Sequence, residues 1–287
     1  MPAEPMTDAR LAKDAVRTQW NEAAAGWNDS SRIIREWLRE ATRAMLGMAE
    51  IEPGSRVLDV AAGAGDQTLD IAARVGPAGS VLATDLSPEI LTFAKRNAEA
   101  AGFHNVETLV SDGEALAIEE ASFDAVVCRL GLMLFTDPLQ GLCEMRRALK
   151  PGGGICTVVF STPESNPCAA ILVSTALKHA GQPPRDPYQR GSLFSLGKPG
   201  LIDMLFAQAG FTQVATTKMA APFRLPSLRH YLDFARSAAA PIVKILEGLE
   251  PARRQAAWAE VEEKLSRFDT RAGWEGPNEL LLTAARR

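Results

Sequence analysis

Cysteine and histidine are scarce in this chain of 287 residues, and the few that occur are not grouped. The four cysteines are Cys128, Cys143, Cys156 and Cys168. They form no CxxC pair, so neither a zinc site nor a redox dithiol is expected, and no other metal site is predicted. Their apolar surroundings predict buried, reduced thiols and a cytoplasmic protein. The three histidines are His104, His179 and His230.

Long apolar runs and a strong excess of one charge are also missing. The chain has 31 basic and 35 acidic residues, a net charge of −4, which argues against nucleic acid as its main partner. No window approaches the ~18 uninterrupted apolar residues of a membrane span. The first twenty residues mix charges throughout and do not resemble a signal or transit sequence. With 46% hydrophobic residues, the chain can still bury a sizeable core.

The middle of the chain alternates short β-rich runs with helical patterns. Strands are predicted at 56–61, 80–84, 106–110, 124–128 and 154–160. Helices are predicted between them at 68–75, 88–101 and 138–149. Strands that alternate with helices indicate an α/β fold, with a mostly parallel sheet and helices on both of its faces.

The two flanks differ from this middle region. Two helices are predicted between Asp8 and Glu50, with a loop at Asn28, Asp29 and Ser30. After Phe160 comes a proline-rich segment that resembles an insertion over the sheet. The remaining elements are predicted as helices at 198–209, 227–246 and 251–268 and strands at 212–218 and 279–285. The expected architecture is a Rossmann-like sheet of about seven strands, with N-terminal helices and with late helices covering its carboxyl edge, where open α/β sheets bind ligands.

The stretch "RVLDVAAGAGDQTLDIA" places a glycine turn after the first strand. Gly63 and Gly65 let the backbone turn sharply and approach a ligand closely. A dinucleotide fingerprint requires a third glycine, and Thr68 stands there instead. Asp66 adds a negative charge where a pyrophosphate would lie. The turn therefore favours a ligand without a diphosphate.

Carboxylates follow the first three predicted strands. Asp59 ends the first strand, and Asp85 ends the second, twenty residues after Gly65, where a carboxylate can accept both hydroxyls of a ribose. Asp112 follows the third and can accept a hydrogen bond from an exocyclic amine. One nucleoside with a positively charged, non-phosphate tail fits all three aspartates.

Five motifs in order resemble the class I S-adenosylmethionine-dependent methyltransferases. They are "LDVAAGAGD", "ATDLS", "SDGEAL", "FDAVVCRLGLMLFTDP" and "LKPGG". The resemblance spans roughly Ser55 to Phe160 and is nearest the ubiquinone and menaquinone biosynthesis C-methyltransferases and related small-molecule enzymes. It implies a single domain over 1–287, with a helical segment at 1–50, a cofactor-binding core at 51–161, and the rest of the sheet with substrate-covering helices at 162–287.

The resemblance also implies roles for individual residues. Asp59, Ala61 and Gly63 would hold the methionine portion of S-adenosylmethionine, and Gly65 would allow close packing of the turn. Asp85 would bind the ribose and Leu86 would line the adenine. The remaining cofactor-binding residues would be Asp112, Gly113 and Glu114 at the adenine edge, the backbone of Arg129 and Leu130 near the sulfonium, and Trp20 and Trp27 in an N-terminal segment that closes over the cofactor.

The acceptor is less well defined by the sequence. Where the quinone enzymes have an asparagine-containing segment after the fourth strand, this chain has "CRLGLMLFTDP", and its helical tail is longer. Met133 and Phe135 are the predicted walls of an apolar acceptor site. Tyr188, together with Arg190, is predicted either as a lid contact or as plain surface. His230, in the late helices, is the candidate catalytic base, with a structural role as the alternative.

The predicted activity is methyl transfer to a small, apolar, aromatic or polyketide-like acceptor, on carbon, oxygen or nitrogen, with S-adenosylhomocysteine as the other product. Two alternatives remain open from the sequence. One is an NAD(P)-dependent reductase, and the other is a protein that binds S-adenosylmethionine without transferring its methyl group. The sequence leaves open whether the chain forms a homodimer.

Overall fold

Two nearly continuous helices begin the chain. The computed structural model describes residues 8–287, and the side chains of 13–239 and 242–287 within them. Helix α1 spans Asp8–Asp29 and helix α2 spans Ser31–Met48. The loop predicted at 28–30 is reduced to Ser30, because its N–H and its hydroxyl both donate to the Gly26 carbonyl and so prolong the helical hydrogen bonding.

A seven-stranded sheet forms the centre of the structure. Its strands are β1 (Arg56–Val60), β2 (Ser80–Asp85), β3 (Val106–Val110), β4 (Phe123–Arg129), β5 (Leu149–Phe160), β6 (Thr212–Ala220) and β10 (Glu279–Arg286). Their order is β3-β2-β1-β4-β5-β10-β6, and only β10 runs antiparallel to its neighbours. The predicted fold class, a mostly parallel α/β sheet of about seven strands, is confirmed.

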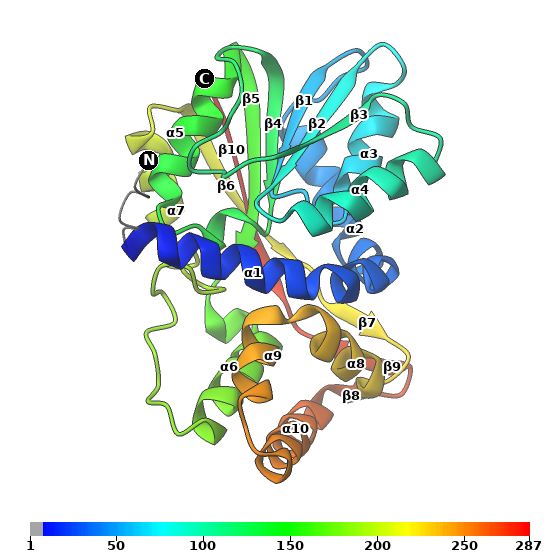
Figure 1. The fold of residues 1–287 in the computed structure, drawn as a ribbon, viewed down its shortest axis with the longest axis vertical. Coiled ribbons are helices and arrows are strands. Elements are labelled where there is room, and N and C mark those ends of the chain that lie inside the picture. The colour runs from blue at the N-terminus through cyan, green and yellow to red at the C-terminus, as the bar shows by residue number, and fades with distance from the viewer. Residues whose placement is uncertain (1–7) are drawn as a thin grey trace, which may run out of the picture.

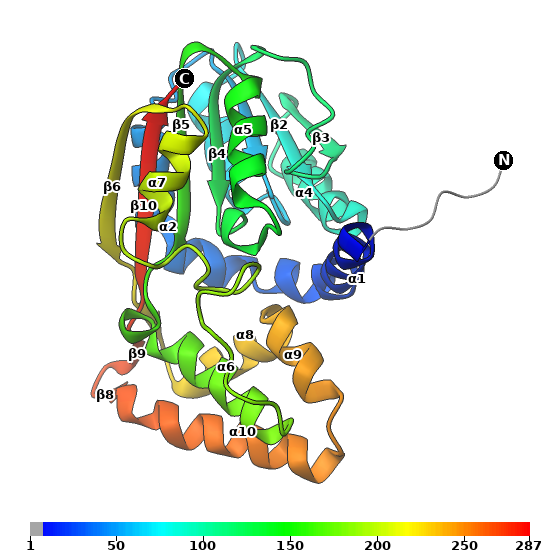
Figure 2. The same ribbon diagram turned by 90° about the vertical axis from the view of Figure 1, so that its left-hand side faces the viewer.

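Helices cover both faces of this sheet (Figures 1 and 2). The helices that follow the strands are α3 (Asp66–Val75), α4 (Pro88–Ala100), α5 (Pro138–Ala148) and α7 (Leu201–Gln208). Helix α3 contacts both α2 and α4 on one side, and α5 contacts α7 on the other. Their apolar faces and the strands form one hydrophobic core, which includes Leu58, Val126 and Met145.

A second layer, called the cap below, lies beyond the carboxyl ends of the parallel strands (Figure 1). It comprises α6 (Pro167–His179), α8 (Leu228–Ala238), α9 (Ala240–Glu247), α10 (Pro251–Leu265) and a small sheet of β7 (Phe223–Leu225), β8 (Asp269–Thr270) and β9 (Gly273–Gly276). The remaining short 3₁₀ helices are η1 (Leu132–Leu134), η2 (Pro163–Ser165) and η3 (Ser266–Phe268). The cap has its own hydrophobic core around Trp274.

One prediction about the cap region was wrong, and one element of the cap was missed. The single helix predicted at 227–246 is broken at Ala239, because Pro241 lacks an N–H to continue the helical ladder and is instead accommodated in the first turn of α9. The small sheet was not predicted, because strands of two to four residues carry no measurable periodicity. No helix in residues 8–287 is both long and apolar enough to cross a membrane.

Helix α1 crosses between the sheet and the cap (Figures 1 and 2). It contacts α4 beside the sheet and α8 and α9 in the cap. The Asn21 amide oxygen accepts from the Ser87 hydroxyl at 2.6 Å, and Lys244 pairs with Glu22 at 2.7 Å. The N-terminal helix therefore covers the carboxyl edge of the sheet, where the candidate site lies.

Candidate functional site

Two adjoining cavities lie along this edge, between the sheet, α1 and the cap. The first contains about 840 Å³ of empty space and the second about 790 Å³, both counted out to their open mouths. The residues that line both cavities are Trp20, Trp27, Leu130 and Leu134. The two Trp rings meet edge to face, with their centroids 5.6 Å apart.

The first cavity begins at the glycine turn after β1. Ala61 and Gly63 line it, with φ angles of 55° and 60°. A Cβ on Gly63 would lie 3.2 Å from the indole nitrogen of Trp27, so glycine lets α1 approach the turn. Gly65 does not line the cavity. A Cβ there would lie 3.0 Å from Cα of Ala94, which agrees with the predicted role of Gly65 in packing.

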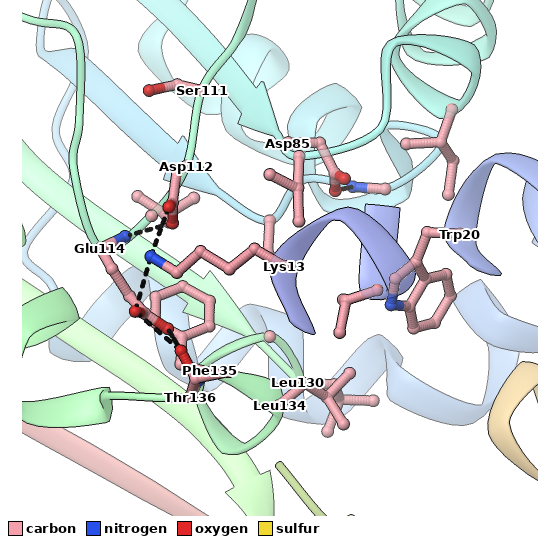
Figure 3. Close-up of a pocket in the computed structure, with 18 of the residues that line it drawn as sticks. Lys13, Trp20, Asp85, Ser111, Asp112, Glu114, Leu130, Leu134, Phe135 and Thr136 are labelled. Carbon is pink, nitrogen blue, oxygen red and sulfur yellow. Dashed lines mark hydrogen bonds and ion pairs between the residues drawn. The ribbon is translucent and has the colours of Figure 1, made fainter. Parts of the chain in front are cut away.

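Asp85 lines the first cavity at the end of β2 (Figure 3). Its carboxylate accepts hydrogen bonds of 3.0 Å from the backbone N–H groups of Gly63 and Ser87. Burial raises the pKa of Asp85, and these backbone hydrogen bonds limit the rise. The carboxylate thereby joins the glycine turn to the start of α4. Leu86, the next residue, also lines this cavity.

The loop after β3 adds an acidic wall. Asp112, Gly113 and Glu114 line the cavity, and Lys13 of α1 reaches across to both carboxylates, at 2.5 Å from Asp112 and 2.8 Å from Glu114 (Figure 3). Burial alone would raise the pKa of Glu114, but hydrogen bonds from Lys13, Asp137 and Thr136 lower it. Burial alone would lower the pKa of Lys13, but its bonds to the two carboxylates raise it. Glu114 and Lys13 are therefore both charged at neutral pH.

Asp59 does not reach the cavity. It is fully buried, and its two oxygens accept hydrogen bonds from Gln67 Nε2 at 3.0 Å and Thr68 Oγ1 at 2.6 Å. Burial raises its pKa to about 6, against the lowering effect of these hydrogen bonds and of Arg129. The expectation that three aspartates would face one ligand is therefore wrong for Asp59, which instead anchors the first turn of α3 to β1.

Arg129 ends β4 and is followed by Leu130, which lies where the two cavities meet. Both line the first cavity, while the guanidinium of Arg129 donates to Thr42 Oγ1 of α2 at 2.8 Å. Leu130 has a φ of 61°, which is unusual for a residue with a side chain, and its N–H donates to the Val158 carbonyl at 2.7 Å. This strained backbone turns the Leu130 side chain toward the junction (Figure 3).

The second cavity is almost entirely apolar. Its wall residues from the sheet side and α2 are Trp37, Met133 and Phe160, and those from the cap include Leu172, Phe223, Tyr231 and Phe234. Among residues 13–239 and 242–287, no carboxylate, histidine, lysine or arginine lines it. Burial raises the pKa of Cys168 to about 12 and that of Tyr231 well above its ordinary value, so both stay neutral at pH 7.

The structure places the four predicted acceptor residues differently. Met133 lines the second cavity. Phe135 lines the first cavity, where its ring packs against Gly113 and Gly141. Tyr188 lines neither. His230 is exposed at the start of α8, with Nδ1 2.9 Å from the Ser227 hydroxyl, and so it cannot act as a base in either cavity.

Lys13 and Asn278 are among the residues of the site that were not found from the sequence. Lys13 lies at helical spacing from Val16, Trp20 and Trp27, and this stripe was a usable signal for a helix face over the cavity. Asn278 lines the second cavity from the turn before β10. The sequence "GPNELLL" around it has no pattern that marks a ligand contact.

Residues 30–174 match the model of the ubiE/COQ5 methyltransferase family. The chain is similar to a demethylmenaquinone methyltransferase of Staphylococcus saprophyticus, with 28% identity over 73% of this chain and 93% of the relative. It is also similar to a ubiquinone/menaquinone biosynthesis C-methyltransferase of Geotalea daltonii, with 36% identity over 46% of this chain and 54% of the relative. The second match thus spans about half of that relative's length.

Solved structures share the fold. The YcgJ protein of Bacillus subtilis superposes with a TM-score of 0.58 and 19% identity, over 87% of this chain and 98% of the other. A phosphoethanolamine N-methyltransferase of Haemonchus contortus, solved in complex with S-adenosyl-L-methionine, superposes with a TM-score of 0.57 and 17% identity, over 91% of this chain and 57% of the other. At these identities the likeness concerns the fold alone.

Proposed function

The chain belongs to the ubiE/COQ5 methyltransferase family and is an S-adenosylmethionine-dependent methyltransferase, and we propose that its two cavities hold the cofactor and the acceptor side by side. The first cavity would hold S-adenosylmethionine and the second a small apolar acceptor. The observation that carries this proposal is the shared wall, since a cavity with three lining carboxylates opens beside an uncharged, apolar one at Leu130 and Leu134. Family membership gives no support to the reductase alternative.

The first cavity fits S-adenosylmethionine in charge and shape. Its charged lining residues are three carboxylates, Asp85, Asp112 and Glu114, against Lys13 and Arg129. This balance suits a cationic ligand and disfavours a diphosphate. A Cβ on Gly113 would lie 2.3 Å from the Phe135 ring, so glycine leaves room for that ring to form a flat wall.

The proposed contacts follow from this lining. Asp85 accepts hydrogen bonds from the ribose hydroxyls, and Leu86 and Phe135 border the adenine. Asp112 and Glu114 lie at the adenine edge, where Lys13 of α1 is tied to both. Ala61, Gly63 and Leu130 border the methionine end. Trp20 and Trp27 cover the ligand and exclude water.

When bound, S-adenosylmethionine would supply a methyl group on a positively charged sulfur; an electron pair of the acceptor would form the new bond in line with the C–S bond, whose electrons remain on the sulfur. The protein's own part is to align the acceptor and to keep the junction dry. The groups lining the second cavity in the described part of the chain offer no base at neutral pH. We therefore propose that the acceptor enters as a neutral compound and releases its proton to solvent, not to a base of the cavity.

The acceptor class follows from the second cavity. Its aromatic walls and its lack of charge favour a neutral, planar, apolar ring compound. The names of the relatives refer to ubiquinone and menaquinone, which are compounds of this general kind. A screen with a methyl-labelled cofactor and a cell extract, read by mass spectrometry, identifies the acceptor.

Substitution of Asp85 tests the cofactor assignment. Asp85→Ala removes the carboxylate proposed to bind the ribose, and S-adenosylhomocysteine affinity is expected to fall by about 1–3 kcal/mol, the scale for lost hydrogen bonds to a charged group. Isothermal titration calorimetry measures the change. Asp70→Ala, at a carboxylate on α3 that does not line either cavity, is the control and should bind as the wild type does. An unchanged affinity in Asp85→Ala contradicts the assignment.

A further inference from the structure

A single amide group lies unpaired in the apolar wall of the second cavity. Asn278 is only 6% exposed, and its Nδ2 has no hydrogen-bond partner among the described residues. Burying an amide without a partner is unfavourable. The wall around Asn278 is otherwise built from aromatic and aliphatic side chains. A polar group of a ligand in this cavity would supply the missing partner.

The backbone around Asn278 is firmly held. The Ala221 N–H donates to the Asn278 carbonyl at 2.8 Å, and the Ala221 carbonyl accepts from the Trp37 indole at 2.7 Å. On the other side, the Glu279 N–H donates to Oδ1 of Asn166, a fully buried residue, at 2.9 Å. These bonds fix the position from which the amide meets the cavity, as a specific binding group requires.

The neighbouring walls are flat and aromatic. The rings of Trp37 and Phe223 are stacked with centroids 4.0 Å apart and an angle of 20° between their planes, and Phe160 continues the stack at 6.1 Å from Trp37. Because the Trp37 indole N–H is already bonded to Ala221, it offers nothing polar to a ligand. Among the described lining residues, the polar groups open to a ligand include the Asn278 amide and the neutral hydroxyl of Tyr231.

We propose that Asn278 anchors the acceptor through a hydrogen bond from its amide to a polar group on the acceptor ring. This role rests on the proposed function, since it assigns the second cavity to the acceptor. The aromatic walls fix the plane of the ring, and Asn278 fixes its rotation within that plane. The reacting atom is thereby directed to the junction with the first cavity. Ring compounds that lack a hydrogen-bonding group bind less tightly.

An anchoring role and a purely structural role predict opposite changes in stability. An asparagine that the fold itself requires loses partners when it is replaced, so the protein is destabilised. Asn278 has no side-chain partner to lose at Nδ2, and Asn278→Leu replaces a buried unpaired amide with an apolar group. The expected result is an unchanged or raised thermal midpoint with impaired ligand selectivity, a combination found where function opposes stability.

The test compares two probes of the same shape, 1-naphthol and 1-methylnaphthalene, of which only the first can form the hydrogen bond. Their affinities are measured by quenching of tryptophan fluorescence, because Trp20, Trp27 and Trp37 line the cavity. In the wild type, 1-naphthol is expected to bind roughly tenfold more tightly than 1-methylnaphthalene. In Asn278→Leu the ratio is expected to fall to about one, through loss of 1-naphthol binding.

Two further variants keep the test decisive. Asn278→Ala serves if the Leu side chain proves too large for the site, and it is expected to lose the same ratio. Met133→Leu changes another wall residue without removing a polar group, and it should shift both affinities together. A wild-type ratio that persists in both Asn278 variants, or no binding of 1-naphthol to the wild type, overturns the anchoring role.

S-adenosylhomocysteine binding separates this role from the proposed function. If S-adenosylhomocysteine binds the wild type and Asn278→Leu equally while the probe ratio is unaffected by the substitution, the anchoring role fails and the cofactor assignment stands. A different outcome is that S-adenosylhomocysteine binds neither protein while the ratio of 1-naphthol to 1-methylnaphthalene affinity still depends on Asn278. In that case the cofactor assignment fails and the anchoring role of Asn278 in the second cavity stands.

Discussion

Two carboxylates of adjacent strands, Asp59 and Asp85, have different environments and therefore different roles. Asp85 lines the first cavity and is held by backbone N–H groups. Asp59 is buried behind the glycine turn, and each of its carboxylate oxygens accepts a hydrogen bond, one from Gln67 and one from Thr68. The residue at the position of the third glycine in a dinucleotide fingerprint, Thr68, is therefore used to hold the turn in place.

Asp59→Asn tests the structural role of this carboxyl group. Its folded-state pKa of about 6 exceeds the ordinary value of 3.8 because it is buried. The folded protein therefore binds the proton more tightly than the unfolded chain does. The stability that the protonated form contributes, on the order of 3 kcal/mol, is present below about pH 4 and is lost as the pH rises through 6.

The neutral amide in Asp59→Asn removes this titration. We expect the variant to lose the decline in unfolding free energy that Asp59 causes between pH 4 and 7, and to be at least as stable as the wild type at pH 7.5. Urea unfolding at several pH values measures this. Asp70→Asn, at a half-exposed carboxylate of α3, should retain the wild-type decline. A decline that persists in Asp59→Asn would show that other groups cause it.

Residue positions could be predicted where the chain order determines them. Asp85 and Asp112 end neighbouring parallel strands, and the carboxyl ends of such strands must meet at one edge. Asp59 was misplaced because its partners, Gln67 and Thr68, come from the following helix, and the sequence does not show that they face it. His230 was misplaced because the rotation of α8 about its axis is set by packing in the cap. Asn278 was missed because only the folded cap surrounds it with apolar groups.

Helix α1 depends on close contacts that only small residues allow. A Cβ on Gly26 would lie 2.2 Å from the Ser237 carbonyl oxygen of α8. Beside this contact, the hydroxyls of Ser30 and Ser237 are 2.9 Å apart. The same helix carries Trp20 and Trp27 into both cavities. The packing of α1 against α8 of the cap therefore sets the position of Trp20 and Trp27 over the site.

Gly26→Ala is expected to disturb this contact between α1 and α8. The clash with a backbone carbonyl cannot be relieved by a side-chain rotation, so the unfolding free energy should fall by about 1–3 kcal/mol despite the better helix propensity of alanine. S-adenosylhomocysteine affinity should fall with it, because α1 shifts. Urea unfolding and calorimetric titration measure the two effects.

Gly47→Ala provides the matched control in α2. Nothing lies within 4 Å of a Cβ at Gly47, so this substitution adds helix propensity alone and should raise the unfolding free energy by about 0.5–1 kcal/mol. Equal effects of the two substitutions would show that the contact of α1 with α8 is not tight.

At the scale of secondary structure, the length of a helix or strand determined whether it could be predicted from the sequence. The strands of the large sheet and helices such as α4 were predicted because a full period of apolar residues repeats along each of them. The start of β5 at Leu149 was predicted five residues too late, because "KPGG" has the composition of a turn although it continues the strand. The four residues 150–153 have no partner in β4, because the register shifts between the pairs Phe123–Leu149 and Ala125–Gly154.

At the scale of the whole molecule, two hydrophobic cores are joined through the region that holds the ligands. One core lies within the large sheet and its helices, and the other lies in the cap. Trp37 packs against both, and α1 contacts elements of both. A ligand between the two layers therefore contacts the groups that connect the two cores. Binding in the first cavity should stabilise helices of the cap as well.

Hydrogen exchange tests this coupling. Saturation with S-adenosylhomocysteine stabilises α1 through Lys13, Trp20 and Trp27, and α1 in turn holds α8 through Gly26 and Ser30. At a hundredfold excess over Kd the stabilisation reaches about 2.7 kcal/mol, enough to slow amide exchange by up to about a hundredfold. We expect slower exchange in α1 and α8, measured by mass spectrometry of peptides.

Helix α7 supplies the internal comparison, because it contacts α5, β6 and β10 and lines neither cavity. Its amides that exchange by local opening should be unaffected, and protection that stops at α1 would show that the cap moves independently of the cofactor site. Protection of α8 that disappears in Gly26→Ala, while S-adenosylhomocysteine is still saturating, would locate the coupling in the contact between α1 and α8. The cap would then respond to the cofactor before any acceptor binds.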